Sequence, residues 1–249
     1  MKKITLCLFL AYQGVFHGGY TLTAADLTQA TSAAPAEYGE LLSRYAKPNG
    51  VRYAAWHANP ADLEKLKKVV DFYATTTPPK GRDSALAWHI NAYNAWILNN
   101  ILKKYPTEGP LAGETLFFHG NRIVVSGKEI SLDYLEQKMI RPTFKEPRIH
   151  FAVNCASESC PPLMTKPFEA STLDADLTKL TKEFINNNPQ GIRLDKSGVK
   201  ISKIFEWYAE DFGGKDKLIA YISQYRDQPL PVDTKSVFMD YSWKLNSTK

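Results

Sequence analysis

The sequence predicts an α+β fold in a single domain, with a helix-rich N-terminal half and a small, mostly antiparallel sheet in the C-terminal half. Helical patterns fill the chain up to residue 106, whereas short strand-like runs separated by turn signals appear after it. The regular alternation of strand and helix that builds a parallel sheet is missing. We expect the domain to span 59–249, after a lead and short helix at 26–58.

The first 25 residues have the pattern of a secretory signal peptide. The chain begins with MKK, continues with the short apolar run ITLCLFLAYQGVF and then reaches the small residues TLTAA. We therefore exclude 1–25 from the fold and expect a periplasmic or secreted protein. No later segment has the length and hydrophobicity expected of a membrane span.

The charge pattern gives no support for a nucleic-acid partner. Without Lys2 and Lys3 the formal net charge falls from +5 to +3, which is a small excess for a chain of this size. The remaining lysines are interspersed with acidic residues, as in ADLEKLKKVVD. This arrangement is typical of a solvated helix face.

Three helices are expected in the N-terminal half. The first is YGELLSRY, which the Pro-Asn-Gly sequence at 48–50 ends, and the second begins at Pro60 in NPADLEKLKKVVDFYATT. The third, at 84–106, is apolar nearly all round and should be buried in the middle of the domain. Its amides, Asn91 and Asn94, then need hydrogen-bond partners, and we expect them to hold neighbouring loops in place.

The C-terminal half predicts short strands and amphipathic helices. TLFFHGNRIVVSGKEISL indicates strands with turns, SLDYLEQKMIRP a helix with Ser131 as N-cap, and RIHFAVNCA a strand at the centre of the sheet. LDADLTKLTKEFINNNP predicts a helix and GIRLDKSGVKIS a hairpin. The helices IFEWYAEDFGG and KDKLIAYISQY follow, and the alternation in VFMDYSWKL predicts a last, half-buried strand.

Five separated segments carry a resemblance to a known family: WHINAYNAW, SLDYLEQKMIRP, PRIHFAVNCASESCPPL, IFEWYAEDFGG and YSWKLN. In this order they resemble the domain of unknown function 547 family, from residue 60 to residue 246. The resemblance implies no settled activity, and a cysteine-hydrolase-like function is the one it suggests. The chain departs from the family pattern at His89, where an aromatic residue is usual, and at Gln137, where a histidine often follows Glu136.

The segment IHFAVNCASESC contains the residue types that thiol chemistry needs. In a regular strand, His150 and Cys155 point to opposite faces and stand about 16 Å apart. A general base must come within about 3 Å of the proton that it removes, so His150 would not serve Cys155 in that geometry. Cys160 could return towards the strand after the turn, but only past several residues. A working site would therefore need a base from elsewhere in the chain, such as His57, His89 or His119, or would use the two cysteines differently.

The cysteine pair could form a disulfide or provide a free nucleophilic thiol. Cys155 and Cys160 are the two cysteines of the mature chain, and an exported protein meets oxidising conditions, which favours a disulfide. The alternative is a free nucleophile, because Cys160 precedes two prolines where a turn could offer backbone amides to a thiolate. The spacing fits neither a Cys-x-x-Cys redox motif nor, with His150, a zinc cluster, so we expect no metal and no cofactor.

The sequence favours a non-catalytic periplasmic binding or scaffold domain with a Cys155–Cys160 disulfide. Its partner would be a peptide, a glycan or another protein, and the candidate binding residues are Asn91, Tyr93, Asn94, Asn154 and Arg141. The alternative is a cysteine-dependent hydrolase, peptidase- or transglutaminase-like, with Cys160 or Cys155 as nucleophile. The remaining catalytic candidates are His150 and Glu136, and for Glu136 we expect an ion pair with Arg141 or Arg148.

Overall fold

The computed structural model describes residues 27–112, 116–120, 122–195, 198–231 and 233–248, together with two short strands, β1 (Gly14–Val15) and β2 (Thr21–Leu22). Apart from these two strands, the predicted signal peptide lies outside the described residues. The α+β prediction is confirmed, because long helices dominate the N-terminal half and the strands form only small sheets.

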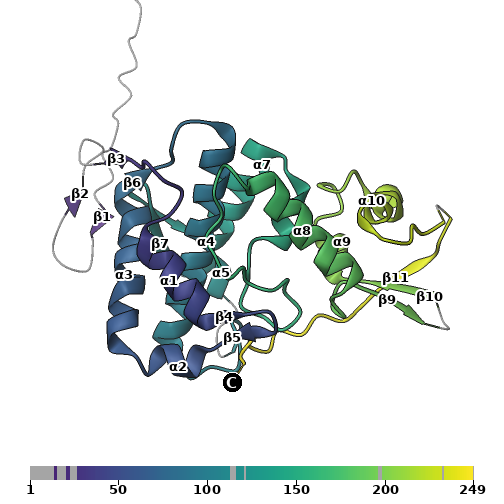
Figure 1. The fold of residues 1–249 in the computed structure, drawn as a ribbon, viewed down its shortest axis with the longest axis horizontal. Helices are drawn as coiled ribbons and strands as arrows, with labels where there is room; N and C mark the ends of the chain where they lie inside the picture. The colour runs from purple at the N-terminus through teal and green to yellow at the C-terminus, as the bar shows by residue number, and fades with distance from the viewer. Residues whose placement is uncertain are drawn as a thin grey trace, which may run out of the picture.

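Long helices form one side of the molecule (Figure 1). They are α1 (Ala36–Tyr45), α3 (Pro60–Thr75) and α4 (Arg82–Lys104), and the short helix α2 (Tyr53–His57) comes between α1 and α3 in the chain. Helix α3 packs against both α1 and α4. It begins at Pro60 as predicted, and the Asn59 side chain caps it by accepting the Asp62 backbone N–H. Every residue of α4 from Leu86 to Leu102 is buried, which confirms its central position.

Short strand pairs join the helices of this half. They are β3 (Thr28–Gln29) with β6 (Thr76–Thr77), β4 (Ala46–Lys47) with β5 (Gly50–Val51), and β7 (Arg122–Val125) with β8 (Lys128–Ser131). The first pair is parallel and the other two are antiparallel. The short helix α5 (Phe117–Gly120) precedes β7. The β7–β8 hairpin turns at Ser126 and Gly127, where the sequence predicted a turn and where both residues have positive φ.

The C-terminal half holds the remaining sheet and helices, drawn from green to yellow in Figure 1. The sheet has the order β11 (Ser236–Phe238), β10 (Gly198–Ile201), β9 (Ile192–Asp195). The pair β9–β10 is the predicted antiparallel hairpin, whereas β11 adds in parallel. The helices are α8 (Leu173–Asn186), α9 (Lys203–Trp207), η4 (Lys215–Lys217) and α10 (Leu218–Tyr225).

The last predicted strand is shorter than expected, because regular pairing ends at Phe238. The chain then runs across the molecule as an irregular segment, 239–248, which we call the C-terminal strap. Its backbone bonds to the loop that carries the cysteines, from Glu158 N–H to Lys244 O at 2.7 Å and from Asn246 N–H to Ala156 O at 3.1 Å. These backbone hydrogen bonds hold the cysteine loop in place, although the strap itself belongs to none of the named strands.

The segment RIHFAVNCA is not a strand, so that prediction was wrong. It begins as a 3-10 helix, η3 (Pro147–Phe151), which Glu146 caps by accepting the Arg148 N–H at 3.2 Å. Pro147 suits the first turn of a helix, because its missing N–H has no partner there in any case. Before η3, the predicted helix after the Ser131 N-cap is present as α6 (Leu132–Tyr134), the π-helix η2 (Leu135–Ile140) and α7 (Arg141–Phe144).

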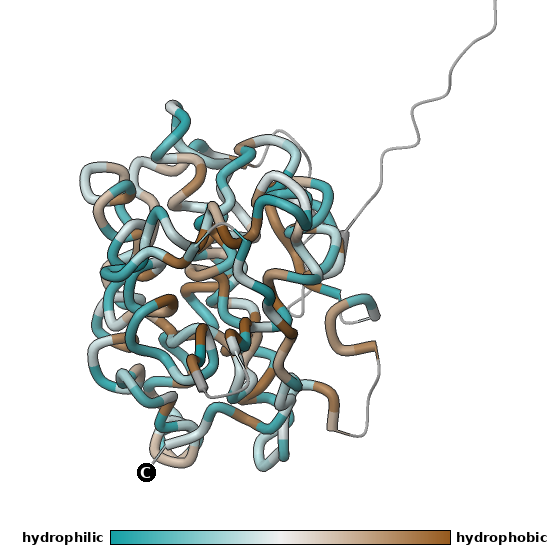
Figure 2. The backbone as a smooth tube through the Cα atoms, turned by 90° about the vertical axis from the view of Figure 1, so that its right-hand side faces the viewer, coloured by the Kyte–Doolittle hydropathy of each residue, from teal (hydrophilic) through white to brown (hydrophobic). Residues whose placement is uncertain are grey.

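The buried side chains form a larger cluster around the N-terminal helices and a smaller one in the C-terminal half. Helix η3 lies where they meet, because Ile149 belongs to the larger cluster and Phe151 to the smaller one. Figure 2 shows short hydrophobic stretches interrupted by hydrophilic ones along the chain. Among the described residues, no helix combines the length and the hydrophobicity needed to cross a bilayer.

Candidate functional site

A cavity of about 370 Å³ brings together side chains from both halves of the molecule. Its wall includes Tyr93 of α4, Glu136 of η2, Arg141 of α7, His150 of η3 and both cysteines. The lining also includes residues at the end of α9 and in the strap. The cavity therefore collects most of the candidates that the sequence singled out.

The two cysteines are free thiols in the structure. Their sulfur atoms lie 2.8 Å apart and share a hydrogen bond, whereas a disulfide would hold them at about 2.05 Å. The backbone N–H of Cys155 also donates to the sulfur of Cys160, at 2.9 Å. The predicted disulfide is thus absent here, and the chain turn between the two residues brings the sulfurs together without a covalent bond.

The Cys155 sulfur has three polar side chains around it. Besides Cys160, the hydroxyl oxygens of Ser157 and Tyr241 lie 3.0 and 3.1 Å from it. Burial alone would raise the pKa of Cys155, but hydrogen bonds from Cys160, Ser157 and Tyr241 stabilise the thiolate and lower the pKa to about 7. Burial and the neighbouring thiolate raise the pKa of Cys160. In the neutral pair the Cys155 thiol donates to the Cys160 sulfur, and when Cys155 ionises the protonated Cys160 becomes the donor.

The loop around Cys155 adopts an uncommon backbone conformation. Ala156 has a φ of 61°, in the left-handed region that residues with a Cβ seldom occupy. Asn154 supports this turn, since its side-chain oxygen accepts the Ala156 N–H at 2.9 Å and its amide donates to Pro161 O at 2.7 Å. Asn94 in turn accepts the Asn154 N–H at 2.8 Å. Such local strain persists where surrounding bonds over-determine it, and it is enriched at functional sites.

His150 is held in a defined orientation on the cavity wall. Its Nε2 lies 2.7 Å from Oδ2 of Asp211, and the Tyr208 ring stacks on the imidazole with 3.8 Å between ring centroids. Arg141 binds both oxygens of Asp211, at 2.7 and 2.9 Å, and also bonds to Gln137. Burial alone would raise the pKa of Asp211, but the bonds from His150 and Arg141 hold it well below the usual range.

The other imidazole nitrogen of His150, Nδ1, is buried and has no hydrogen-bond partner among the described residues. An ionised Asp211 makes Nε2 the donor, which leaves Nδ1 as the nitrogen that can exchange a proton. A buried polar atom without a partner is uncommon and is often found where a protein needs it for function. The strand geometry that separated His150 from Cys155 does not apply, because η3 carries His150 and the loop after it brings Cys155 to the same cavity.

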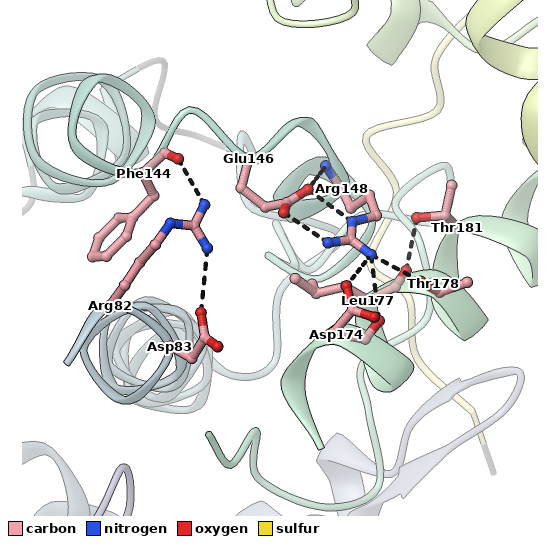
Figure 3. Close-up of polar contacts among 9 residues, drawn as sticks. All are labelled: Arg82, Asp83, Phe144, Glu146, Arg148, Asp174, Leu177, Thr178 and Thr181. Carbon is pink, nitrogen blue, oxygen red and sulfur yellow. Dashed lines mark hydrogen bonds and ion pairs between the residues drawn. The ribbon is translucent and has the colours of Figure 1, made fainter. Parts of the chain in front are cut away.

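A separate ion-pair network fixes η3 to α8 and so supports His150 (Figure 3). Arg148 donates to both oxygens of Glu146 at 2.8 Å, and to Asp174 and Thr178 at 2.8 Å each. The side chains of Arg148 and Glu146 are only 15% and 11% exposed. Burial would raise the pKa of Glu146, but the Arg148 bonds outweigh it and lower the pKa.

We expect Arg148→Ala to destabilise the protein by about 3 kcal/mol, because Glu146 would remain buried without its partner. The double variant Arg148→Met/Glu146→Gln should lose less, since it leaves no buried charge unpaired. Folding lowers the pKa of Glu146, so this carboxylate stabilises the fold fully above the ordinary glutamate pKa. The stabilisation is lost as the pH falls from there through the lowered pKa of the folded state. Urea unfolding at neutral and acidic pH would test this, and equal losses at both would contradict it.

The other sequence candidates separate into two groups. Tyr93 and Arg141 line the cavity with Glu136, but Glu136 does not form the expected ion pair, since Arg141 binds Asp211 and Arg148 binds Glu146. Asn91, Asn94 and Asn154 are buried structural amides rather than cavity-lining groups, and Asn91 bonds to Ala33 and Phe168. This agrees with the expectation that the amides hold loops in place.

Among the alternative bases, only His119 lines this cavity, where its ring lies 3.5 Å from Asp133. His57 packs against Tyr105 elsewhere, and His89 bonds to Ala85 O inside the core.

No group of three or more His, Cys, Asp or Glu side chains is placed to hold a metal ion within the described part of the chain.

Four residues that contact the Cys155 sulfur or the His150 ring were not singled out from the sequence: Ser157, Tyr208, Asp211 and Tyr241. Ser157 stands between the cysteines, and the other three lie in IFEWYAEDFGG and YSWKLN, two of the motifs that carried the family resemblance. The presence of these residues in the family motifs was therefore the one sequence signal that could have selected them. The local sequence does not show that the two motifs contact the cysteine loop, because 86 positions separate Tyr241 from Cys155.

A family model matches the central part of the chain. Its description is "Protein of unknown function, DUF547", and the match covers residues 79–185. This segment is a DUF547 domain. No curated protein and no solved structure matches the chain. The DUF547 segment contains both cysteines, His150, Glu136 and Arg141, whereas Tyr208, Asp211 and Tyr241 follow it, so the cavity is built from the family segment and the chain beyond it.

Proposed function

We propose that the protein is an exported cysteine-dependent hydrolase in which Cys155 is the nucleophile. The observation that carries this proposal is the set of hydrogen-bond donors around one cavity-lining sulfur, which favours the thiolate near neutral pH. A thiolate, rather than a thiol, attacks carbonyl carbon. The arrangement therefore supports the hydrolase alternative over the passive binding domain that the sequence favoured.

The reaction would proceed through a thioester. The Cys155 sulfur forms a bond to the carbonyl carbon, the bond to the leaving group breaks, and the leaving group takes up a proton. Water then attacks the thioester, which releases the acid and returns the proton and the thiolate. The Tyr241 hydroxyl, close to the sulfur, is a candidate donor to the oxyanion that forms in each step.

His150 is the candidate for the proton transfers. Asp211 holds its Nε2, as the third group of a Cys-His-Asp set holds the imidazole, and Nδ1 has no other partner among the described residues. Both His150 and Cys155 line the cavity into which a substrate would enter. Binding of substrate commonly tightens such contacts relative to the free enzyme.

Trapping of the acyl-enzyme tests this function on the full chain. We expect p-nitrophenyl acetate to leave an acetyl group on Cys155, detected by intact mass and peptide mapping. Cys155→Ser should abolish the adduct, Cys160→Ala should retain it with slower formation, and His150→Ala should slow its hydrolysis. Thermal unfolding of each variant would show that the fold is kept.

Alkylation without reductant, under denaturing conditions, decides between this function and the binding alternative. Two iodoacetamide labels on the mature protein would show free thiols. No label would show a disulfide, and the proposed nucleophile would then be unavailable. Absence of an acetyl adduct on freely alkylated protein would also overturn the hydrolase proposal and leave a periplasmic binding or scaffold domain.

A further inference from the structure

The charged groups on the cavity wall leave an excess of negative charge. Arg141 is already paired with both oxygens of Asp211, so its positive charge is compensated. The remaining acidic side chains on the wall are Glu136 and Asp133, and Asp133 lies 3.5 Å from the His119 ring. A cleft lined by one sign of charge concentrates ligands of the opposite sign.

Glu136 is the most unusual of these groups. It is 5% exposed, and its hydrogen-bond partners are neutral: the Gln137 amide at 3.4 Å and the Tyr208 hydroxyl. Within the described part of the chain no cation lies within ion-pair distance of it, and the charge of Arg141, which is bound to Asp211, acts on it only from farther away. A buried carboxylate without a cation is costly, and buried charges are normally paired. The position on the cavity wall therefore fits a carboxylate whose cation arrives with a ligand.

Aromatic rings surround the same space. The rings of Trp207, Tyr241 and Trp243 contact one another, with centroids 4.7 to 5.9 Å apart, and all three line the cavity. Trp207 is 45% exposed, so its ring is accessible from solvent. Aromatic faces attract cations electrostatically, and tryptophan is the strongest of them.

From the unpaired carboxylate and the aromatic walls together, we propose that the cavity recognises a primary ammonium group on its substrate. The ammonium would lie against Glu136 and the aromatic faces, beside the sulfur that attacks the substrate. As a statement about the substrate, the inference rests on the proposed function, but the binding itself needs only the cavity. A lysine side chain and an amino sugar both present this chemistry.

Calorimetric titration of the full chain distinguishes these sources. The lysine arm compares Nα-acetyl-lysine methylamide with the neutral norleucine analogue, and the sugar arm compares glucosamine with N-acetylglucosamine. In at least one arm we expect the cationic ligand to bind about tenfold more tightly, with a preference that declines as salt is added. Equal binding of cationic and neutral ligands in both arms, or no binding at all, would overturn the proposal.

Variants then locate the binding. Glu136→Gln should remove the preference for the cation, whereas Glu183→Gln, on the wall of a second cavity, should leave it unchanged. Glu136→Gln changes a buried side chain and could alter the fold. Trp207→Ala therefore provides a second test at an exposed position, and it should weaken cation binding several-fold. Retained preference in both Glu136→Gln and Trp207→Ala would place the ligand elsewhere and contradict the proposal.

The two proposals fail separately. Acetylation of Cys155 without any cation preference would leave the hydrolase intact and remove the ammonium substrate. Cation binding to a protein that never forms the acetyl adduct would leave a binding site for amines and remove the thiol chemistry.

Discussion

Replacing Tyr241 by phenylalanine is expected to raise the pKa of the Cys155 thiol from about 7 by one to two pH units. The variant keeps the ring and removes the hydroxyl that lies 3.1 Å from the sulfur. A hydrogen bond to a charged group contributes about 1.5–3 kcal/mol, and 1.36 kcal/mol corresponds to one pKa unit. The Ser157 hydroxyl lies 3.0 Å from both the sulfur and the Tyr241 oxygen, and without Tyr241 its hydrogen is available to the sulfur alone, so we expect the lower part of this range.

The measurement is the rate of iodoacetamide alkylation of Cys155 against pH. The inflection should move to higher pH in Tyr241→Phe and further in Tyr241→Phe/Ser157→Ala. The inflection is a better readout than the rate at one pH, because a thiolate of higher pKa is also intrinsically more nucleophilic. Tyr134→Phe, at a tyrosine that is 49% exposed, is the matched control and should leave the inflection in place. An unchanged inflection in Tyr241→Phe would disprove the stabilising role of Tyr241.

Substituting Gly109 by alanine is expected to destabilise the fold and to reduce the reactivity of Cys155 together. A Cβ at Gly109 would stand 2.1 Å from the backbone oxygen of Trp243 in the strap, so the strap must move away. Overpacking of this kind costs about 1–3 kcal/mol. Since Tyr241 lies two residues before Trp243, the displacement also withdraws its hydroxyl from the sulfur.

Gly39→Ala provides the control for this prediction. Gly39 lies inside α1, and a Cβ there would meet Pro167 at 3.6 Å, an ordinary contact. We expect a gain of about 0.5–1 kcal/mol and no change in alkylation, because alanine is a better helix former than glycine. Chemical unfolding and alkylation of both variants check these results. A Gly109→Ala protein with unchanged stability and reactivity would show that the strap tolerates the methyl group.

Much of the fold was predictable where the signals are local. The Asn59–Pro60 start of α3 and the Ser131 cap depend on hydrogen bonds within a few residues, and both are present. The apolar character of 84–106 correctly placed α4 in the core. The strand prediction for RIHFAVNCA failed because a short apolar run fits a buried strand or a helical turn equally well. The 3-10 conformation of this segment depends on Pro147 and on the Glu146 cap, together with the packing of η3 between two hydrophobic clusters.

The candidate site was predictable in composition but not in arrangement. The sequence selected Cys155, Cys160, His150 and Glu136, and the structure places all of them on one cavity. Asp211 follows His150 by 61 positions, and this distant contact is invisible to local patterns. The strand assignment also misdirected the argument about His150, since the side-chain alternation of a strand does not hold in a 3-10 helix.

The dependence of Cys155 on Tyr241 also has a consequence during protein synthesis. The ribosome makes the cysteine 86 positions before the tyrosine whose hydroxyl approaches its sulfur. A growing polypeptide therefore carries an ordinary cysteine, mostly protonated at neutral pH. The lowered pKa arises only after the distant tyrosine has docked, so we expect the thiol of an incomplete chain to react no faster than an ordinary cysteine.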